Sequence, residues 1–418
     1  MRYCKRCLYH EQHPLLLTID EEGICSGCRV HEEKDLLDWK ERGTKLGHIL
    51  RNYKNNNGSN YDCIVPVSGA RDSHFIVHTI KNVYGMNPLL VTYNKQYNTD
   101  VGIRNLANLR IKFDCDIMTL TVKPETVKKI TRATLRKMGS IYWHCIAGQT
   151  VYPVQVAVKF KIPLIIWGAH QGVDQVGMFS HNDEVEMTRK YRKEHDLMGY
   201  EADDLINDFD NITAQDVVAY QYPHDKEIEN IGVRGIYLNN YIRWDSKAQH
   251  EHMIKQLNYE TALAINTFDT YNDVDCYNYN DLHDYIKFLK HGYGKVTDHA
   301  CREIRLRRMT RDQAIEFVKI YTPIQPRNLN LFLDWIGINE HSFHYLIDQH
   351  RNKKLWRRNN DWEWEFIGHY FPENESPKDI EQSRLEQVEP FSNFILTPIK
   401  QSTDSNSKYI LIGKGVDK

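Results

Sequence analysis

Short apolar runs alternate with amphipathic stretches along the first 170 residues. Four runs rich in β-branched and aromatic residues predict buried strands over Cys63–Val67, Leu89–Tyr93, Ile117–Val122 and Pro163–Trp167. Helical periodicity predicts helices over Ser73–Tyr84, Asp100–Lys112, Glu125–Lys137 and Ala147–Lys159. Continuous apolar strands separated by helices are typical of a parallel sheet covered on both faces. We therefore expect an α/β domain.

The flanking segments differ from this pattern. Residues 1–35 are Cys-rich and irregular, whereas an amphipathic helix and an Asn-rich loop fill 36–60. Residues 169–260 show no regular hydrophobic pattern. Residues 278–356 have a mostly helical pattern, and residues 372–408 are polar. We expect four parts: a zinc-binding module (1–40), a nucleotide-binding α/β domain (41–260), a mostly helical C-terminal domain (261–370) and a polar tail whose composition favours mobility (371–418).

Composition narrows the function classes. The 418 residues hold 54 Lys and Arg against 56 Asp and Glu, and this balance argues against a nucleic-acid backbone as the main partner. No apolar run approaches the roughly 20 residues of a membrane helix, and the N-terminus has no apolar signal core. We expect a cytoplasmic protein without a membrane span. Its nine cysteines then favour metal ligands or free thiols over disulfides.

Two Cys-x-x-Cys pairs stand near the N-terminus, Cys4 with Cys7 and Cys25 with Cys28. The 17 residues between the pairs suit a four-thiolate zinc site, in which each pair comes from a tight turn. We expect structural Zn²⁺ that supports folding and takes no part in the chemistry. Free thiols and an iron–sulfur centre are the alternatives. Gly23 and Gly27 are expected to supply flexibility to the second turn.

A Ser/Gly loop follows the first predicted strand and precedes a helix. Such loops hold phosphate through backbone N–H groups and the helix N-terminus. The candidate ATP-binding residues are Ser68, Gly69, Ala70, Arg71, Asp72 and Ser73, together with Gly168 after the fourth predicted strand. Arg71 adds a charge that pairs with phosphate, and Asp72 is expected to help place Mg²⁺ or to order the loop. The alternative is a plain helix N-cap, which is itself compatible with binding.

Three further segments offer chemistry. Trp143-His144-Cys145 is expected in a loop between two helices, where His144 has the chemistry of an acid or base and Cys145 that of a nucleophile. The alternative is a packed aromatic loop with an inert thiol. Gly168, His170 and Gln171 follow the fourth strand and are expected near the site, unless they form only a turn. Lys295 precedes a helix and is expected to neutralise phosphate charge, unless it belongs to a simple helix-start loop.

The loop resembles the PP-loop, S-G-G-x-D-S, of ATP pyrophosphatases, with Ala70 in place of the second Gly. A methyl group there is expected to tighten the loop or restrict positive φ. Most of the chain through about residue 370 resembles the bacterial N-acetyl sugar amidotransferases of the WbpG/PseA type. That resemblance rests on Met1–Leu8, Tyr61–Ser73, Tyr142–Gly148, Ile162–Gly168 and Lys295–Arg311. The segment after Gly168 lacks the Glu-Asn of many relatives.

The resemblance implies ATP-dependent conversion of a sugar acetamido group to an acetamidino group in surface-glycan biosynthesis, with AMP and pyrophosphate as products. With this reaction we expect catalytic roles for Arg71, Asp72, His144 and Lys295, and substrate contacts from Trp143, Cys145, His170 and Gln171. Zn²⁺, ATP and Mg²⁺ are the implied metals and nucleotide. Ammonia is expected from a separate glutaminase through a synthase-like channel subunit. A homodimer remains open.

Two other functions use the same loop. A PP-loop tRNA-thiolating enzyme would add a reactive cysteine, but the balanced charge and the lack of a second cysteine beside Cys145 argue against it. A non-catalytic nucleotide-binding scaffold is disfavoured by the intact Ser68, Asp72 and Ser73. Pyrophosphate release distinguishes the three functions. It would depend on a glycan for the amidotransferase and on RNA for the thiolating enzyme, and it would be absent for the scaffold.

Overall fold

A five-stranded parallel sheet organises the α/β part of the chain. The computed structural model describes residues 1–206 and 211–368. The strand order is β3-β2-β1-β4-β5, and neighbouring strands pair in parallel. The strands are β1 (Cys63–Pro66), β2 (Pro88–Tyr93), β3 (Ile117–Leu120), β4 (Leu164–Trp167) and β5 (Arg234–Tyr237). The predicted α/β fold with a parallel sheet is confirmed, and β1 lies at its centre.

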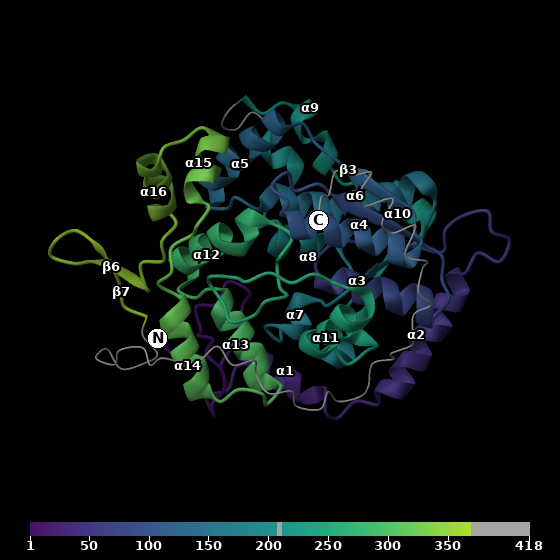
Figure 1. Ribbon diagram of the computed structural model, residues 1–418, viewed down its shortest axis with the longest axis horizontal. Coiled ribbons are helices and arrows are strands. Elements are labelled where there is room, and N and C mark those ends of the chain that lie inside the picture. The colour runs from purple at the N-terminus through teal and green to yellow at the C-terminus, as the bar shows by residue number, and fades with distance from the viewer. Residues whose placement is uncertain (207–210, 369–418) are drawn as a thin grey trace.

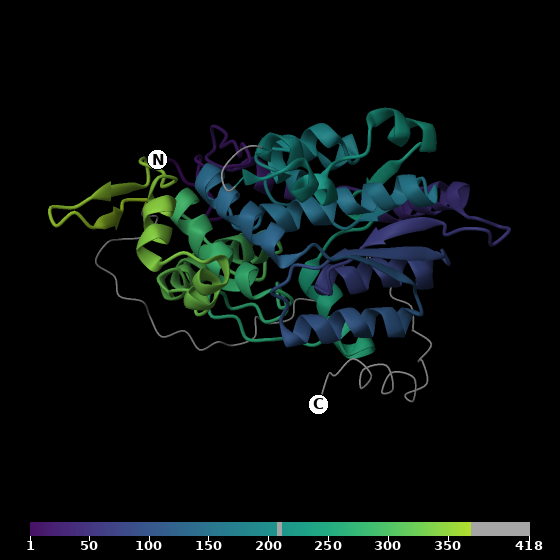
Figure 2. The same cartoon turned by 90° about the horizontal axis from the view of Figure 1, so that it is seen from above.

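Helices cover both faces of the sheet (Figure 2). Cys63 and Val65 of β1 point to one face, whereas Ile64 points to the other, as the alternation of strand side chains requires. The first face packs against α2 (Trp39–Tyr53), α3 (Arg71–Val77), α4 (Asp100–Phe113) and α11 (Ser246–Leu257). The second face packs chiefly against α6 (Trp143–Phe160), with α10 (Asp225–Ile231) beside it. Both faces are therefore apolar, as the continuous apolar strands predicted.

The element boundaries correct several expectations. Helix α6 begins at Trp143 rather than at Ala147, so Trp143-His144-Cys145 form its first turn and are not a loop. Helix α3 begins at Arg71 and continues as a π-helical segment, His78–Val83. Strand β5 was not predicted. The 169–260 segment that lacked a clear pattern holds β5, α11, and the short helices α7 (Gln171–Asp174), α8 (Arg189–Tyr191) and α9 (Ala214–Val217).

The C-terminal region is mostly helical, as predicted. It contains α12 (His283–His291), α13 (Lys295–Arg305), α14 (Arg311–Tyr321), α15 (Leu329–Ile336) and α16 (Glu340–Asp348). A hairpin of β6 (Trp356–Arg358) and β7 (Trp364–Phe366) follows. Helices α12, α15 and α16 share a core with this hairpin and with α5 (Pro124–Met138). The predicted polar tail, residues 371–418, lies outside the described residues.

The N-terminal segment packs on the C-terminal helices, although the two are far apart in sequence (Figure 1). The four cysteines share one core cluster with residues of α13 and α14, among them Val296, Ala300 and Phe317. Helix α1 (Ser26–Glu33) begins directly after Cys25 and contains Cys28. This packing places the cysteine segment next to the loops that follow the strands. Within the described residues, no helix has both the length and the apolar character to cross a membrane.

Candidate functional site

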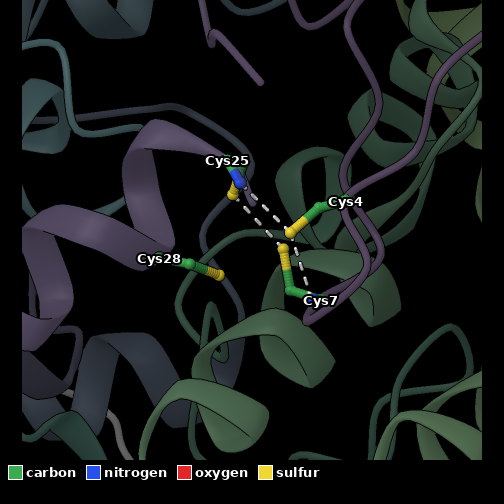
Figure 3. Close-up of side chains that lie close together, drawn as sticks. All are labelled: Cys4, Cys7, Cys25 and Cys28. Carbon is green, nitrogen blue, oxygen red and sulfur yellow. Dashed lines mark hydrogen bonds between the residues drawn. The ribbon is translucent and has the colours of Figure 1, made fainter. Parts of the chain in front are cut away.

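The four N-terminal cysteines form one buried cluster (Figure 3). Their sulfur atoms all lie within 4.8 Å of one another, and the sulfurs of Cys7 and Cys25 are 3.6 Å apart. The backbone N–H groups of Arg6, Cys7 and Cys25 donate to the sulfur of Cys4 at 3.3 to 3.4 Å. Donors of this kind stabilise a thiolate.

This donor set fits a closed metal site. Sulfurs that each lie at the usual Zn–S length of about 2.3 Å from a tetrahedral zinc ion are roughly 3.8 Å apart, and the separations of up to 4.8 Å here are close to that arrangement. Among the described residues, no other group of three or more His, Cys, Asp or Glu side chains has its ligand atoms this close. The four-cysteine grouping predicted from the sequence is confirmed, and zinc as its occupant stays a prediction.

The two glycines of this segment act differently from each other. Gly23 has φ +84°, the left-handed conformation expected of a turn glycine. Gly27 has no positive φ, and a Cβ atom there would lie 2.4 Å from Nη2 of Arg305 and 2.5 Å from the carbonyl oxygen of Gln175. The turn-flexibility role expected of Gly27 is therefore wrong, because its lack of a side chain instead permits a close approach.

The 68–73 loop connects β1 to α3 at the carboxyl edge of the sheet. Gly69 has φ +79°, and a Cβ atom there would lie 2.9 Å from the carbonyl oxygen of Gly102. Ala70 has φ −77° and forms the N-cap of α3, so the position needs no positive φ. The restriction of positive φ expected at Ala70 therefore does not arise, since the position that needs a positive φ is Gly69. The Ser68 hydroxyl accepts from the N–H of Ala70, and the Ser73 hydroxyl accepts from the N–H of Ser68.

Two cavities meet at this loop, and both are lined by Asp72 and Ala169. The first, here called the strand-end cavity, has a volume of about 210 Å³ and lies among the ends of β1, β2 and β4. Its lining includes Ser68, Ser73 and Gly168 together with apolar groups such as Ile76 and Trp167. Its position matches the usual ligand site of an open parallel sheet, beyond the carboxyl ends of the strands.

The second, here called the charged cavity, has a volume of about 340 Å³. Three parts of the chain build it: the N-terminal segment, the loops after the strands, and the C-terminal helices. Its cationic lining residues are Lys34, Arg71, Lys287, Lys295, Arg302 and Arg305. Its acidic lining residues are Asp72, Asp174, Asp273, Asp284 and Asp298. A cavity with this many fixed charges suits a highly polar, anionic ligand.

Most of its cations already have carboxylate partners. Nζ of Lys34 lies 2.5 Å from Asp174, and Nη2 of Arg302 lies 2.9 Å from Asp269. Lys287 pairs with Asp298. These ion pairs hold the cationic groups in fixed positions, as an electrostatically preorganised site requires.

Arg71 and Asp72 lie where the loop enters the charged cavity. Nε of Arg71 is 3.1 Å from Oδ1 of Asp72, whereas Nη1 of Arg71 is buried without a hydrogen-bond partner. Enclosure raises the pKa of the Asp72 carboxyl above its ordinary value, although the Arg71 charge opposes that effect. The unpaired Nη1 donor is available to an oxyanion.

Lys295 is the first residue of α13, and its side chain is buried in the cavity wall. Its Nζ lies 3.0 Å from Asp273 and donates to the carbonyl oxygens of Tyr279 and Asn280 at 3.0 and 3.3 Å. Burial alone would lower the pKa of Lys295, but Asp273 and Asp284 raise it above its ordinary value. Lys295 is therefore a fixed positive charge in the same cavity as Arg71.

The candidates after β4 separate into two groups. Gly168 lines the strand-end cavity and Gln171 lines the charged cavity. His170 lines neither and is 2% exposed, because its ring packs between Tyr191 and Tyr237. Its Nδ1 accepts from the N–H of Gly172, and burial lowers the pKa of His170 to about 4. His170 therefore caps α7 and supports the segment that carries Gln171.

The first turn of α6 lies outside the lining of both cavities. Trp143 is buried and its indole N–H donates to the carbonyl oxygen of Tyr200 at 3.0 Å. The ring nitrogens of His144 lie 2.9 and 2.7 Å from the hydroxyls of Tyr93 and Tyr97. Burial lowers the pKa of His144 to about 3 and raises that of Cys145 well above its ordinary value. At neutral pH this turn therefore holds a neutral imidazole and a thiol, and the hydroxyl of Tyr93, which lines the strand-end cavity, bonds to His144.

Several residues of the charged cavity had no prediction, although they contribute to its chemistry. They are Lys34 from the N-terminal segment, Asp174 at the end of α7, Asp273 and Asp284, and Arg302 and Arg305 of α13. No local motif marks them, because they meet only when distant segments pack. The alternating charged residues along α13 were the sequence signal from which some of them could have been predicted.

The C-terminal region is similar to a known protein family. Residues 265–369 match the family model of the C-terminal domain of WbpG-like LPS biosynthesis proteins. This segment is therefore similar to the C-terminal domain of WbpG-like proteins. It contributes Asp273, Asp284, Lys295, Arg302 and Arg305 to the charged cavity. The resemblance stated from the sequence is thereby confirmed for the WbpG-like segment.

Two further comparisons give partial matches. The uncharacterized protein MJ1599 of Methanocaldococcus jannaschii is 26% identical over 117 residues, which are 28% of this chain and 42% of that protein. The aligned region thus spans less than half of that relative. The NMN synthetase of Francisella tularensis aligns in structure over 54% of this chain and 98% of its own, with 14% identity and a TM-score of 0.26.

Proposed function

We propose that the chain is an ATP-dependent amidotransferase of lipopolysaccharide or related surface-glycan biosynthesis. The observation that carries this proposal is the pair of cavities joined at the 68–73 loop. One cavity, partly apolar, suits the nucleoside of ATP, and the other suits phosphates and a polar second substrate. The WbpG-like domain that supplies half of the charged wall supports a role in glycan synthesis.

The proposed reaction converts an acetamido group of an activated sugar to an acetamidino group. The amide oxygen attacks the α-phosphorus of ATP, the bond to the β-phosphate breaks, and pyrophosphate leaves. Ammonia then adds to the carbon of the resulting O-adenylyl imidate, and AMP departs with the former amide oxygen. Adenylation is needed because amide oxygen by itself is a poor leaving group.

Named residues supply the electrostatics of this scheme. The unpaired Nη1 of Arg71 and the fixed charge of Lys295 suit the phosphate charge that develops as pyrophosphate leaves. Mg²⁺ bound to ATP would take Asp72 as a carboxylate ligand and receive its other ligands from phosphate oxygens and water. That arrangement fits the observation that the cavity's acidic side chains form no close three-ligand group of their own among the described residues.

The direct test incubates the chain with ATP, Mg²⁺, ammonium and a panel of activated acetamido sugars. We expect pyrophosphate release that depends on the sugar, and a product lighter by about one mass unit, because NH replaces O. Release that depends on tRNA instead of sugar would favour the thiolating alternative. Absence of release with every sugar and RNA would favour the scaffold.

A further inference from the structure

Arg305, at the end of α13, connects the cysteine cluster to the charged cavity. Its Nη2 lies 3.7 Å from the sulfur of Cys25, and its guanidinium lies over the ring of Tyr9 at 5.4 Å. Its Nη1 donates to the carbonyl oxygen of Gln175 at 2.6 Å. The same side chain lines the cavity. One guanidinium thus touches both the sulfur cluster and the wall of the ligand site.

The second cysteine pair is shaped to admit this guanidinium. A Cβ atom on Gly27 would come within 2.4 Å of Nη2 and 3.0 Å of Cζ of Arg305. Gly177, with φ +64°, faces the same turn, since a Cβ atom there would lie 2.3 Å from the carbonyl oxygen of Ser26. The Ser26 hydroxyl donates to the carbonyl oxygen of Val176 at 2.6 Å. The Cys25–Cys28 turn, Arg305 and the segment after α7 therefore pack as one unit.

The hydrogen bonds of Arg305 leave one donor unused. Arg305 is 8% exposed, and its buried Nε has no hydrogen-bond partner. Within the described parts of the chain, Arg305 makes no ion pair with a carboxylate, unlike the other cations of the cavity. A buried, unpaired N–H on a charged group is costly unless a ligand satisfies it.

Charge balance explains the position of this cation. Four thiolates around a divalent metal carry a net charge of about −2, and a nearby guanidinium offsets it. The cluster therefore favours a charged arginine at the edge of a cavity whose other cations are neutralised by aspartates.

We propose that Arg305 binds an oxyanion of the ligand in the charged cavity and that the Cys25–Cys28 turn positions it for this role. The cysteine cluster then sets the affinity of the cavity as well as stabilising the fold. The oxyanion is a phosphate of ATP or a carboxylate of the sugar substrate. The inference rests on the proposed function only in expecting an oxyanion in this cavity.

The test compares binding of two probes to the full chain by calorimetry, with the zinc content of each protein measured in parallel. The probes are inorganic pyrophosphate and N-acetylneuraminate, an acetamido sugar with a carboxylate. Arg305→Gln is expected to weaken binding of at least one probe on the order of 10- to 100-fold, the loss of a charge-assisted hydrogen bond. Weakening of pyrophosphate binding assigns Arg305 to phosphate, and weakening of N-acetylneuraminate binding assigns it to the carboxylate. Arg307→Gln removes the same charge from a side chain that is 79% exposed, and should bind as the wild type does.

Gly27→Ala tests the positioning step, because it keeps all four cysteines while obstructing the guanidinium. We expect retained zinc and weaker binding of the same probe that Arg305→Gln affects. If Gly27→Ala loses zinc, Arg305→Lys is the test variant in its place. The single ammonium group of lysine does not reproduce the fork of guanidinium donors, so this variant should bind the probe more weakly than the wild type does.

Three results would overturn the inference. The first is that Arg305→Gln binds both probes with wild-type affinity, and the second is that the wild-type chain binds neither probe. The third is wild-type affinity in a Gly27→Ala variant that retains zinc or, if that variant loses zinc, in Arg305→Lys. Failure of the amidotransferase assay alongside a clear Arg305 effect on pyrophosphate binding would refute only the reaction. Unaltered binding in an active enzyme would refute only the role of Arg305.

Discussion

Gly148 of α6 lies against the ring of Tyr93 at the end of β2, so close that a Cβ atom on Gly148 would be 2.2 Å from Cδ2 of the tyrosine. Both residues line the strand-end cavity. The hydroxyl of Tyr93 also bonds to His144 and Tyr220. The glycine thus allows α6 to approach the sheet where the proposed nucleotide site opens.

This contact predicts that Gly148→Ala destabilises the protein and weakens ATP binding. Alanine favours a helix by about 1 kcal/mol over glycine, but displacing a packed ring costs about 1–3 kcal/mol. Urea unfolding and ATP titration measure the two effects. Gly43→Ala in α2 is the matched control, since its Cβ would meet Tyr84 no closer than 3.7 Å, and it should be neutral or stabilising. A Gly148→Ala variant as stable as Gly43→Ala would contradict the prediction.

The loop residues give a second prediction. Asp72→Ala and Ser68→Ala are each expected to reduce ATP consumption by at least about 100-fold, the effect typical of losing a preorganised electrostatic group. Circular dichroism should stay unchanged, because neither side chain belongs to a core cluster. Asp100→Ala, an exposed aspartate at the start of α4, is the control and should retain activity. Wild-type turnover in both loop variants would remove the loop from the mechanism.

The cysteine cluster predicts near-stoichiometric zinc in the purified protein. A Cys4→Ser/Cys7→Ser double variant removes half of the ligand set and should lose the metal together with several kcal/mol of stability, since binding contributes to folding. Metal analysis by mass spectrometry and thermal unfolding are the measurements. Cys115→Ser changes a thiol outside the cluster and should keep full zinc. Unchanged zinc in the double variant would show that another site holds it.

His144 predicts a loss of stability in acid. Its folded pKa of about 3 lies below the ordinary value of 6.5, so the unfolded chain binds the proton more readily. The contribution of His144 to the free energy of unfolding is fully present above pH 6.5. It is lost as the pH falls toward 3, by up to about 1.4 kcal/mol per pH unit. Urea unfolding at pH 7, 6 and 5 should therefore show a shallower decline in His144→Gln than in the wild type. Parallel declines would assign the acid sensitivity to other buried groups.

Local pattern predicted the centre of the fold but not its edge. Strands β1 to β4 were found because buried strands of a parallel sheet are continuously apolar. Strand β5 was missed because it has no continuous apolar run: it begins with Arg234 and contains Gly235, whose missing side chain makes room for Met187. The start of α6 was missed because Trp143 and Gly148 lower helix propensity, whereas close packing on Tyr93 favours the glycine.

The candidate site was also predicted only in part. The loop and the cysteine pairs were visible because their residues are neighbours in sequence. The charged cavity could not be predicted beyond Ala70, Arg71, Asp72, Gln171 and Lys295. Others of its residues, such as Lys34, Asp174 and Arg305, come from segments more than 100 residues apart. Such convergence is fixed by packing and leaves no local motif.

The last prediction concerns nitrogen supply. We expect the isolated chain to use free ammonium and to use glutamine only when a separate glutaminase is added. A cysteine glutaminase needs an accessible thiolate paired with a base. Cys145, beside His144, is fully buried, and burial raises the pKa of its thiol well above the ordinary value.

The assay offers the purified chain an acetamido sugar and ATP, with ammonium or glutamine as separate nitrogen sources. Product should form with ammonium, be nearly absent with glutamine, and appear with glutamine once a glutaminase is present. Cys145→Ala is expected to keep ammonium-dependent activity to within a few fold, because the substitution leaves both cavities intact. Efficient glutamine use by the lone chain, abolished by Cys145→Ala, would instead make Cys145 a nucleophile and require the first turn of α6 to open to solvent.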